Sequence, residues 1–257
     1  MERIRLVLVF LFLLTPAYSA ELTPPTAQIS AASTQITVPT MANTPGALGG
    51  IFKTKLVLFN PSTFTYPIHV TLYGVNGLVD QKTIGMSAGQ IRNYENFLEE
   101  VFAFSGAGAV NFDSLTIPGG SPNYRFLVNS EVYIDGPSGR FKTVVMTGTP
   151  LDPVSPGVNA YSTGITQDSS NRVNIGCFNA SSLANIIVAE VYDSSNQIIK
   201  TVSITLSGGS WGQVPLGTSV TGGYISWKPS TIAYCYAVVV NNTSNDGSFI
   251  PAANYNP

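Results

Sequence analysis

An internal repeat constrains the fold of this chain more than any other feature of its sequence. Residues 56–62 (LVLFNPS) reappear as residues 175–181 (IGCFNAS), a shift of 119 positions. At the same shift, residues 68–73 match residues 187–192, and the correspondence continues in order over some hundred residues. Repeats of this length are whole domains rather than solenoid units. The sequence therefore predicts two tandem copies of one domain, at residues 36–150 and 151–257.

Each copy has the residue pattern of β-structure. Apolar side chains alternate with more polar ones at residues 67–73, as in a strand with one buried face, and Ile187, Ala189 and Val191 repeat the buried side in the second copy. Turn signals rich in Asn, Ser, Gly and Pro separate these short segments. Short strands between frequent turns predict an all-β fold of two antiparallel, immunoglobulin-like β-sandwich domains, each of about seven strands. One short helix is expected at residues 94–104, and residues 211–220 are expected to be loop.

The N-terminus has the layout of a secretory signal peptide. Arg3 and Arg5 precede a short apolar run, and small residues follow at 17–20, so cleavage is expected after Ser19. The apolar run is shorter than the about 20 residues that a membrane span requires. We expect residues 1–19 to be removed, residues 20–35 to form a flexible leader, and the mature chain to have no transmembrane span. The predicted location is extracellular, cell-surface or periplasmic.

The composition argues against nucleic acid as a partner. Charged residues make up 10% of the chain, against about 25% in typical soluble domains, and the formal net charge is −2. Binding to nucleic acid requires clustered Lys and Arg, which this sequence lacks. The expected surface is polar and weakly charged.

Candidate catalytic and metal-binding motifs have simpler structural explanations. Residues 85–89 and 208–212 match the Gly-x-Ser-x-Gly pattern of serine hydrolases, but the one histidine, His69, precedes both serines and both matches fall in corresponding turns of the repeat. His69 lies between apolar residues of a strand, with no cysteine or second histidine near it. The sequence thus predicts no catalytic residue, no cofactor and no metal ligand. Residues 242–247 have oxygen donors at alternate positions, as calcium loops do, and this possibility stays open beside a plain Asn-rich turn.

These features resemble tandem-repeat β-sandwich domains of bacterial secreted and cell-surface proteins. The resemblance covers residues 38–252 and depends on the Leu-Phe-Asn-Pro corner at 58–61, the Ser-Ala-Gly turn at 87–89 and the Gly-rich strand entry at 106–109. The second copy departs from this pattern at Ala180, where the first has Pro61. The resemblance implies fold and location rather than chemistry.

The two cysteines, Cys177 and Cys235, are predicted to form a disulfide, since oxidation is permitted in an exported chain. Both lie on the apolar side of their strands, and by analogy with immunoglobulin domains the bond would join the two sheets. The alternative is two buried free thiols. In the first copy, Leu58 and Leu127 are expected to occupy the equivalent positions.

Exposed aromatic side chains are the remaining candidates for a binding site. Tyr73 and Tyr192 are equivalent in the repeat and are predicted to point outward, and Trp211 lies near a turn. Such rings anchor protein contacts or stack on sugars. We therefore expect a non-catalytic structural or adhesion-type interaction module whose partner is an unknown protein or glycan of the cell envelope. The alternative is a carbohydrate-binding protein, or an accessory domain of an extracellular enzyme.

Overall fold

The computed structural model describes residues 32–46, 49–115, 124–136, 139–149 and 152–255, which form antiparallel β-sheets with one short helix. The predicted signal peptide and almost all of the predicted leader lie outside the described residues. In the part of the chain that is described, no helix is long and apolar enough to cross a membrane.

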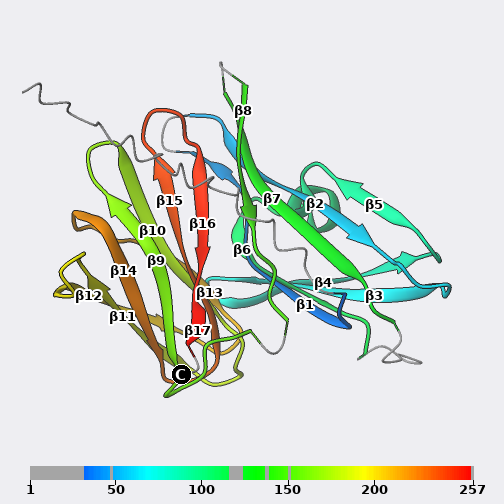
Figure 1. Ribbon diagram of the computed structural model, residues 1–257. Coiled ribbons are helices and arrows are strands. Elements are labelled where there is room, and N and C mark those ends of the chain that lie inside the picture. Colours follow the sequence, from blue (N-terminus) through cyan, green and yellow to red (C-terminus); the bar gives the residue numbers. More distant parts are fainter. Residues whose placement is uncertain (1–31, 47–48, 116–123, 137–138, 150–151, 256–257) are drawn as a thin grey trace, which may run out of the picture.

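The described strands fall into two successive groups, which we call the first half and the second half (Figure 1). The first half comprises β1 (Gln35–Pro45), β2 (Ile51–Phe59), β3 (Tyr66–Gly74), β4 (Gly77–Met86), β5 (Ile91–Tyr94), α1 (Phe97–Phe102), β6 (Gly106–Asp113), β7 (Leu127–Gly136) and β8 (Gly139–Val145). The second half comprises β9 (Asn159–Gln167), β10 (Asn171–Asn179), β11 (Asn185–Tyr192), β12 (Ile198–Leu206), β13 (Trp211–Pro215), β14 (Val220–Pro229), β15 (Ala233–Asn241), β16 (Gly247–Pro251) and β17 (Ala253–Tyr255).

The two halves have the same strand order. In the first half the layers are β4-β3-β6-β1 and β5-β2-β7-β8, and β1 joins them because its end, at Asn43 to Pro45, also pairs with β2. In the second half the layers are β12-β11-β14-β9 and β13-β10-β15-β16, with β17 added beside β9. Each strand of the first half therefore has an equivalent in the second, and Leu58 on β2 and Cys177 on β10 occupy equivalent strands.

This strand order differs from the expected immunoglobulin order. In an immunoglobulin domain the first, second, fifth and fourth strands form one sheet, and the third, sixth and seventh form the other. Here β4 pairs with β3, β7 pairs with β2, and β1 pairs with β6. The period-two pattern fixes only which face of each strand is buried, so it predicted a sandwich correctly but not the neighbours of each strand.

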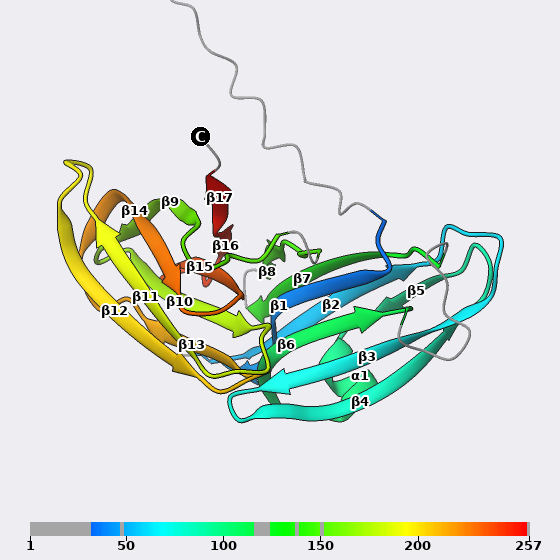
Figure 2. The same cartoon turned by 90° about the horizontal axis from the view of Figure 1, so that it is seen from below.

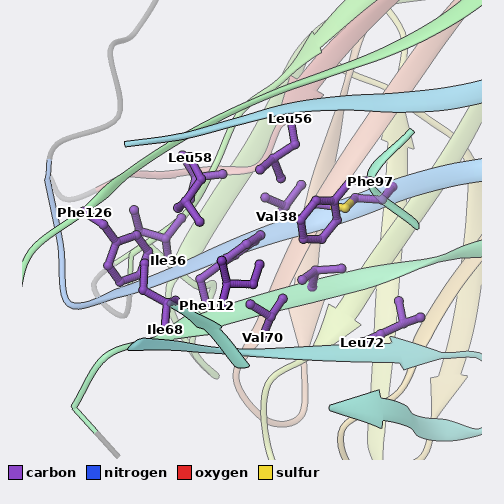
Figure 3. Packing of buried hydrophobic residues seen from close by; sticks show 14 of the residues in the cluster. Ile36, Val38, Leu56, Leu58, Ile68, Val70, Leu72, Phe97, Phe112 and Phe126 are labelled. Atoms are coloured by element: carbon purple, nitrogen blue, oxygen red, sulfur yellow. The ribbon is translucent and has the colours of Figure 1, made fainter. Parts of the chain in front are cut away.

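Each half encloses its own hydrophobic core between its two layers. In the first half, side chains from β1, β2, β3 and β6 point toward one another, with Phe97 of α1 at one side (Figure 3). In the second half the core is built around Trp227, with Ile175, Cys177, Ile187 and Val191 among its buried members. The alternation seen in the sequence produces these cores, because every second side chain of a strand faces the opposite layer.

The predicted helix is present, but it is shorter than expected. α1 buries Phe97, Leu98 and Phe102, and it contacts β2 and β4, which lie in different layers. The prediction that residues 211–220 form a loop is wrong for Trp211–Pro215, which form β13 and pair with β10. Pro215 ends this edge strand, a position that tolerates a residue without an N–H.

A buried asparagine explains why the Phe-Asn-x-Ser segment occurs twice. The Nδ2 atom of Asn60 donates to the carbonyl oxygens of Phe64 at 2.7 Å and Ser87 at 2.9 Å. The Nδ2 atom of Asn179 donates to Leu183 at 2.8 Å and Ser207 at 2.7 Å. Each amide thus fixes the corner after β2 or β10 to the turn that follows β4 or β12.

The predicted disulfide is present, but it lies within one sheet. Cys177 on β10 and Cys235 on β15 are directly opposed in the register, with Cα atoms 4.2 Å apart. Both face the core of the second half, as expected. The prediction that the bond joins the two sheets is wrong, because β10 and β15 are neighbours. The equivalent pair in the first half is Leu58 and Val128, one residue beyond the predicted Leu127.

Candidate functional site

Tyr192 belongs to a group of tyrosines on the outer surface of the second half. Val191 and Ala189 of β11 face the core, so Tyr192 points away from it. Its Cα partner on β14 is Tyr224, and the two rings stack with centroids 4.6 Å apart and planes 5° apart. The ring of Tyr224 lies 5.8 Å from that of Tyr161 on β9, and the ring of Tyr161 lies 6.5 Å from that of Tyr255 on β17, measured between centroids. We call Tyr161, Tyr192, Tyr224 and Tyr255 the tyrosine face.

Polar side chains hold the hydroxyl groups of this face in place. The hydroxyl of Tyr192 donates to Oε2 of Glu190 at 2.9 Å, and Nζ of Lys228 lies 2.7 Å from Oε1 of the same carboxylate. The hydroxyl of Tyr224 donates to Oδ1 of Asn196. Hydrogen bonds from Lys228 and then Tyr192 lower the pKa of Glu190, so this carboxylate stays ionised at neutral pH. The carboxylate in turn raises the pKa of Tyr192.

The chemistry available at the tyrosine face is binding. A direct cation partner lowers the pKa of Glu190, and the carboxylate raises the pKa of Tyr192, so both shifts move these two groups away from the neutral range in which proton transfer is most efficient. Aromatic rings with fixed hydroxyls offer a large apolar area and directed hydrogen bonds at small entropic cost. Tyr255 is 57% exposed, and the other three rings are partly exposed.

Tyr73 and Trp211, the other two predicted contact residues, lie between the two halves. Trp211 is buried, so the expectation that it is exposed is wrong. It packs in a cluster with Phe178 and Ala109, against which Tyr73 also packs. The ring of Tyr73 lies 5.0 Å from that of Phe178, measured between centroids. The partner of these two aromatic residues is therefore the other half of the same chain.

A buried tyrosine, Tyr236, also takes part in this contact between the halves. Tyr236 on β15 accepts a hydrogen bond from Nε1 of Trp211 at 3.0 Å and donates to Oε1 of Gln213 at 3.1 Å. A side-chain hydrogen bond also links it to Thr40 of β1, and burial raises its pKa well above the usual range. Both faces of the sheet β13-β10-β15-β16 are thus covered, one by the core and one by the first half.

A pocket of about 210 Å³ opens beside this contact. It is lined by Gln35, Thr37, Asn111 and Asp113 of the first half and by Pro153, Ile232 and Tyr234 among others of the second. The polar side chains bind one another, since Gln35 donates to Asp113 at 2.8 Å and Thr37 donates to Asn111 at 2.7 Å. These two hydrogen bonds join paired residues of β1 and β6, so they belong to the sheet of the first half.

The remaining sequence candidates lie in turns and on a strand of the fold. Ser87 and Ser207 begin equivalent turns, in which Gly89 and Gly209 both adopt a positive φ. Ser210 is buried and donates to the carbonyl oxygen of Ser207 at 2.9 Å. His69 lies on a paired strand, opposite Thr83 and Asp113. The Gly-x-Ser-x-Gly matches are thus turns after an edge strand rather than strand-to-helix elbows.

The Asn-rich loop at 242–247 is organised around an arginine. The guanidinium of Arg172 donates to Oδ1 of Asn242 at 3.2 Å and to Oδ1 of Asn245 at 2.8 Å. Oδ1 of Asn241 accepts from two backbone N–H groups of the loop. Among the described residues, no group of three or more His, Cys, Asp or Glu side chains gathers where it could hold a metal ion. Two of the candidate calcium donors, the Oδ1 atoms of Asn242 and Asn245, are therefore engaged by a cation of the chain itself.

Sequence reasoning found Tyr192 but did not join it to the other three tyrosines. Tyr224 alternates with Ile225 and Trp227, which indicates that it points away from the core. The register that brings β11, β14, β9 and β17 together comes from long-range pairing, which a single sequence does not specify. A scan against protein-family models finds no match for this chain, and a search of curated proteins finds no related sequence.

Proposed function

We propose that this protein is an exported, non-catalytic interaction module of the structural or adhesion type, which contacts its partner through the tyrosine face. The observation that carries the proposal is the row of four tyrosines across β11, β14, β9 and β17, whose ring contacts and hydrogen bonds fix the rings before any partner binds. Preorganised aromatic residues lose little entropy on binding.

Two further features support the proposal. The disulfide fits an oxidising compartment outside the cytoplasm, in agreement with the signal-peptide pattern. Among the serine and histidine candidates, Ser210 donates to the carbonyl oxygen of its own turn and His69 lies on a paired strand, positions that agree with a role in the fold. Export to the cell surface, the periplasm or the medium, as in the bacterial secreted domains that the sequence resembles, is part of the proposal.

Binding of a glycan is the second candidate function. The hydroxyls of Tyr192 and Tyr224 lie beside Glu190, Lys228 and Asn196, and groups of this kind form hydrogen bonds with sugar hydroxyls while rings stack on the sugar faces.

The test compares the mature protein with a variant that carries Tyr192→Ser and Tyr224→Ser. Both proteins are immobilised and exposed to solubilised envelope of the source cells and to a glycan array. A bound protein that is lost with the variant supports the interaction module, and selective glycan binding lost with the variant supports the second candidate. Binding that is equal for both proteins would overturn the assignment to the tyrosine face. Ile186→Asp is the control, because Ile186 is 54% exposed on the same strand, at its other end.

A further inference from the structure

We propose that the chain associates head to tail with a second copy of itself, so that the row Ile91, Phe59 and Leu127 of one molecule packs on the tyrosine face of the next. This inference rests on the proposed function, for which it supplies a partner. We call Ile91, Phe59 and Leu127 the apolar row. The argument uses the contact between the two halves as a template, because both surfaces have equivalents in that contact.

The template is a row of three aromatic residues in the second half. Phe178 on β10 is the Cα partner of Trp211 on β13 and of Tyr234 on β15. All three side chains point away from the core of the second half and pack on the first half, against Tyr73 and Ala109. The ring of Phe178 lies parallel to that of Tyr234 to within 14°.

The apolar row occupies the same positions in the first half. Phe59 on β2 is the Cα partner of Ile91 on β5 and of Leu127 on β7, as Phe178 is of Trp211 and Tyr234. In the second half the equivalent row of three aromatic residues is covered by the first half. In the first half Ile91 is 57% exposed, and Phe59 and Leu127 are half-buried.

The tyrosine face, in turn, is the equivalent of the surface that receives the template row. Tyr73 pairs with Ala109 across β3 and β6, and Tyr192 pairs with Tyr224 across β11 and β14. A glycine precedes Ala109 on β6 and another precedes Tyr224 on β14. A Cβ atom on the first glycine would overlap the carbonyl oxygen of Tyr73, and one on the second would overlap that of Tyr192. Two residues further along, Asn111 on β6 pairs with Thr37 on β1, and Ser226 on β14 pairs with Tyr161 on β9. Thr37 in the first half therefore corresponds to Tyr161 in the second.

In the contact within the chain the row has the large side chains, whereas in the proposed contact between copies the receiving face has them. Within the chain, the large Trp211 and Tyr234 pack on a surface that has the small Ala109 and Thr37. Between copies, the smaller Ile91 and Leu127 would meet the equivalents of those small residues, Tyr224 and Tyr161. The central pair is aromatic in both cases, because Phe59 would meet Tyr192 as Phe178 meets Tyr73. At the two positions that flank this pair a larger ring thus meets a smaller side chain, within the chain and between copies alike, so that neither flanking position brings two large rings against each other.

The geometry of such a contact is heterologous, since different surfaces of identical molecules meet. Each molecule has one apolar row and one tyrosine face, so a bound pair still offers one free surface of each kind. Heterologous contacts continue into rings or open filaments. The expected product is therefore a series of assemblies that grows with protein concentration rather than a single closed dimer.

The test uses two variants that each remove one surface. Ile91→Asp places a charge in the apolar row, and Tyr192→Ser removes the central ring of the tyrosine face. The mass of the mature protein is measured by light scattering and sedimentation from micromolar to near-millimolar concentration. Wild-type protein is expected to form growing assemblies, and each variant alone is expected to self-associate about tenfold or more weakly. A mixture of the two variants is expected to form 1:1 dimers and nothing larger, because one intact surface remains on each.

Controls on the same strands separate this proposal from a general loss of apolar surface. Ile51→Asp lies at the far end of β2, 49% exposed, and Ile186→Asp lies at the far end of β11, 54% exposed. Both are expected to assemble like wild type. Thermal unfolding shows whether each variant is folded, and Ile198→Asp, which is 53% exposed and is paired with Tyr192, replaces Tyr192→Ser if that variant is unstable.

Three outcomes would overturn the proposal: a wild-type monomer at all concentrations, equal assembly by controls and variants, or a variant mixture without dimers. A monomer whose binding to envelope protein or glycan still requires Tyr192 and Tyr224 would leave the proposed function intact. Failure of the proposed function would instead be seen as envelope or glycan binding that does not depend on these tyrosines.

Discussion

Cys177 and Cys235 face each other across two neighbouring strands of one sheet, with Cα atoms 4.2 Å apart, and so join β10 directly to β15. The bond closes a separation of 58 residues that includes β11 to β14. In the chain-entropy model, closure of such a loop stabilises the folded state by about 4 kcal/mol. The first half has Leu58 and Val128 at these positions and depends on packing alone.

We therefore expect Cys177→Ala with Cys235→Ala to lower the free energy of unfolding of the second half by about 4 kcal/mol. Urea unfolding with and without a reductant measures this effect. The double variant should be insensitive to the reductant, which is the control. Equal stability of the oxidised and reduced wild-type protein would contradict the prediction.

The buried corner asparagines should be equally important in both halves. Asn60→Ala and Asn179→Ala each leave the carbonyl oxygens of the corner and of the following turn without their amide donor. Each substitution is expected to cost about 2–3 kcal/mol of unfolding free energy. Asn93→Ala, at an exposed strand position, is the control and should change it by less than about 0.5 kcal/mol. A small effect at Asn60 beside a large one at Asn179 would show that the two corners are not equivalent.

Two strand glycines should resist substitution for one shared reason. A Cβ atom on Gly108 would overlap the carbonyl oxygen of Tyr73, and one on Gly223 would overlap that of Tyr192. Gly108→Ala and Gly223→Ala are expected to destabilise the protein by about 1–3 kcal/mol, because the paired strand must move. At Gly85 nothing lies within 4 Å of such a Cβ atom, so Gly85→Ala is expected to be neutral or slightly stabilising. Thermal unfolding of the three variants checks this order.

The protein should lose stability in alkaline solution. Burial raises the pKa of Tyr234 to about 12 and that of Tyr66 to about 12. Above the unfolded pKa of about 10, the unfolded chain releases these protons while the folded protein retains them. The contribution of these two protonated tyrosines to the free energy of unfolding is therefore complete below about pH 10, and it is lost as the pH rises toward about 12.

Urea unfolding at about pH 9 and about pH 11 measures this loss. Tyr234→Phe and Tyr66→Phe have no ionisable hydroxyl and should each reduce the difference between the two pH values. Tyr255→Phe is the control, because this ring is 57% exposed. Stability that is unchanged at about pH 11 would contradict the prediction.

Some features of this protein follow from the sequence alone because they depend on short-range rules. Alternation at residues 67–73, and its repeat at Ile187, Ala189 and Val191, indicated which side chains of these two strands face the cores, and only two cysteines left one possible disulfide. The Phe-Asn-x-Ser corners and the turns at Gly89 and Gly209 could be placed because turn chemistry is local. The helix at Phe97–Phe102 could be placed for the same reason, since its apolar residues recur at helical spacing.

Only the tertiary structure decided which strands are neighbours and which outer faces are covered. The sequence predicted outward side chains at Tyr73 and Tyr192 and an exposed Trp211 near a turn. In the structure Trp211 lies on β13 and is buried against the first half, whereas Tyr192 lies in an accessible row with Tyr224. The disulfide lies within a sheet, and Val128 rather than Leu127 is opposite Leu58, because β7 and β15 pair with β2 and β10. A period of two specifies the face of a strand, whereas its partner depends on packing between residues far apart in the chain.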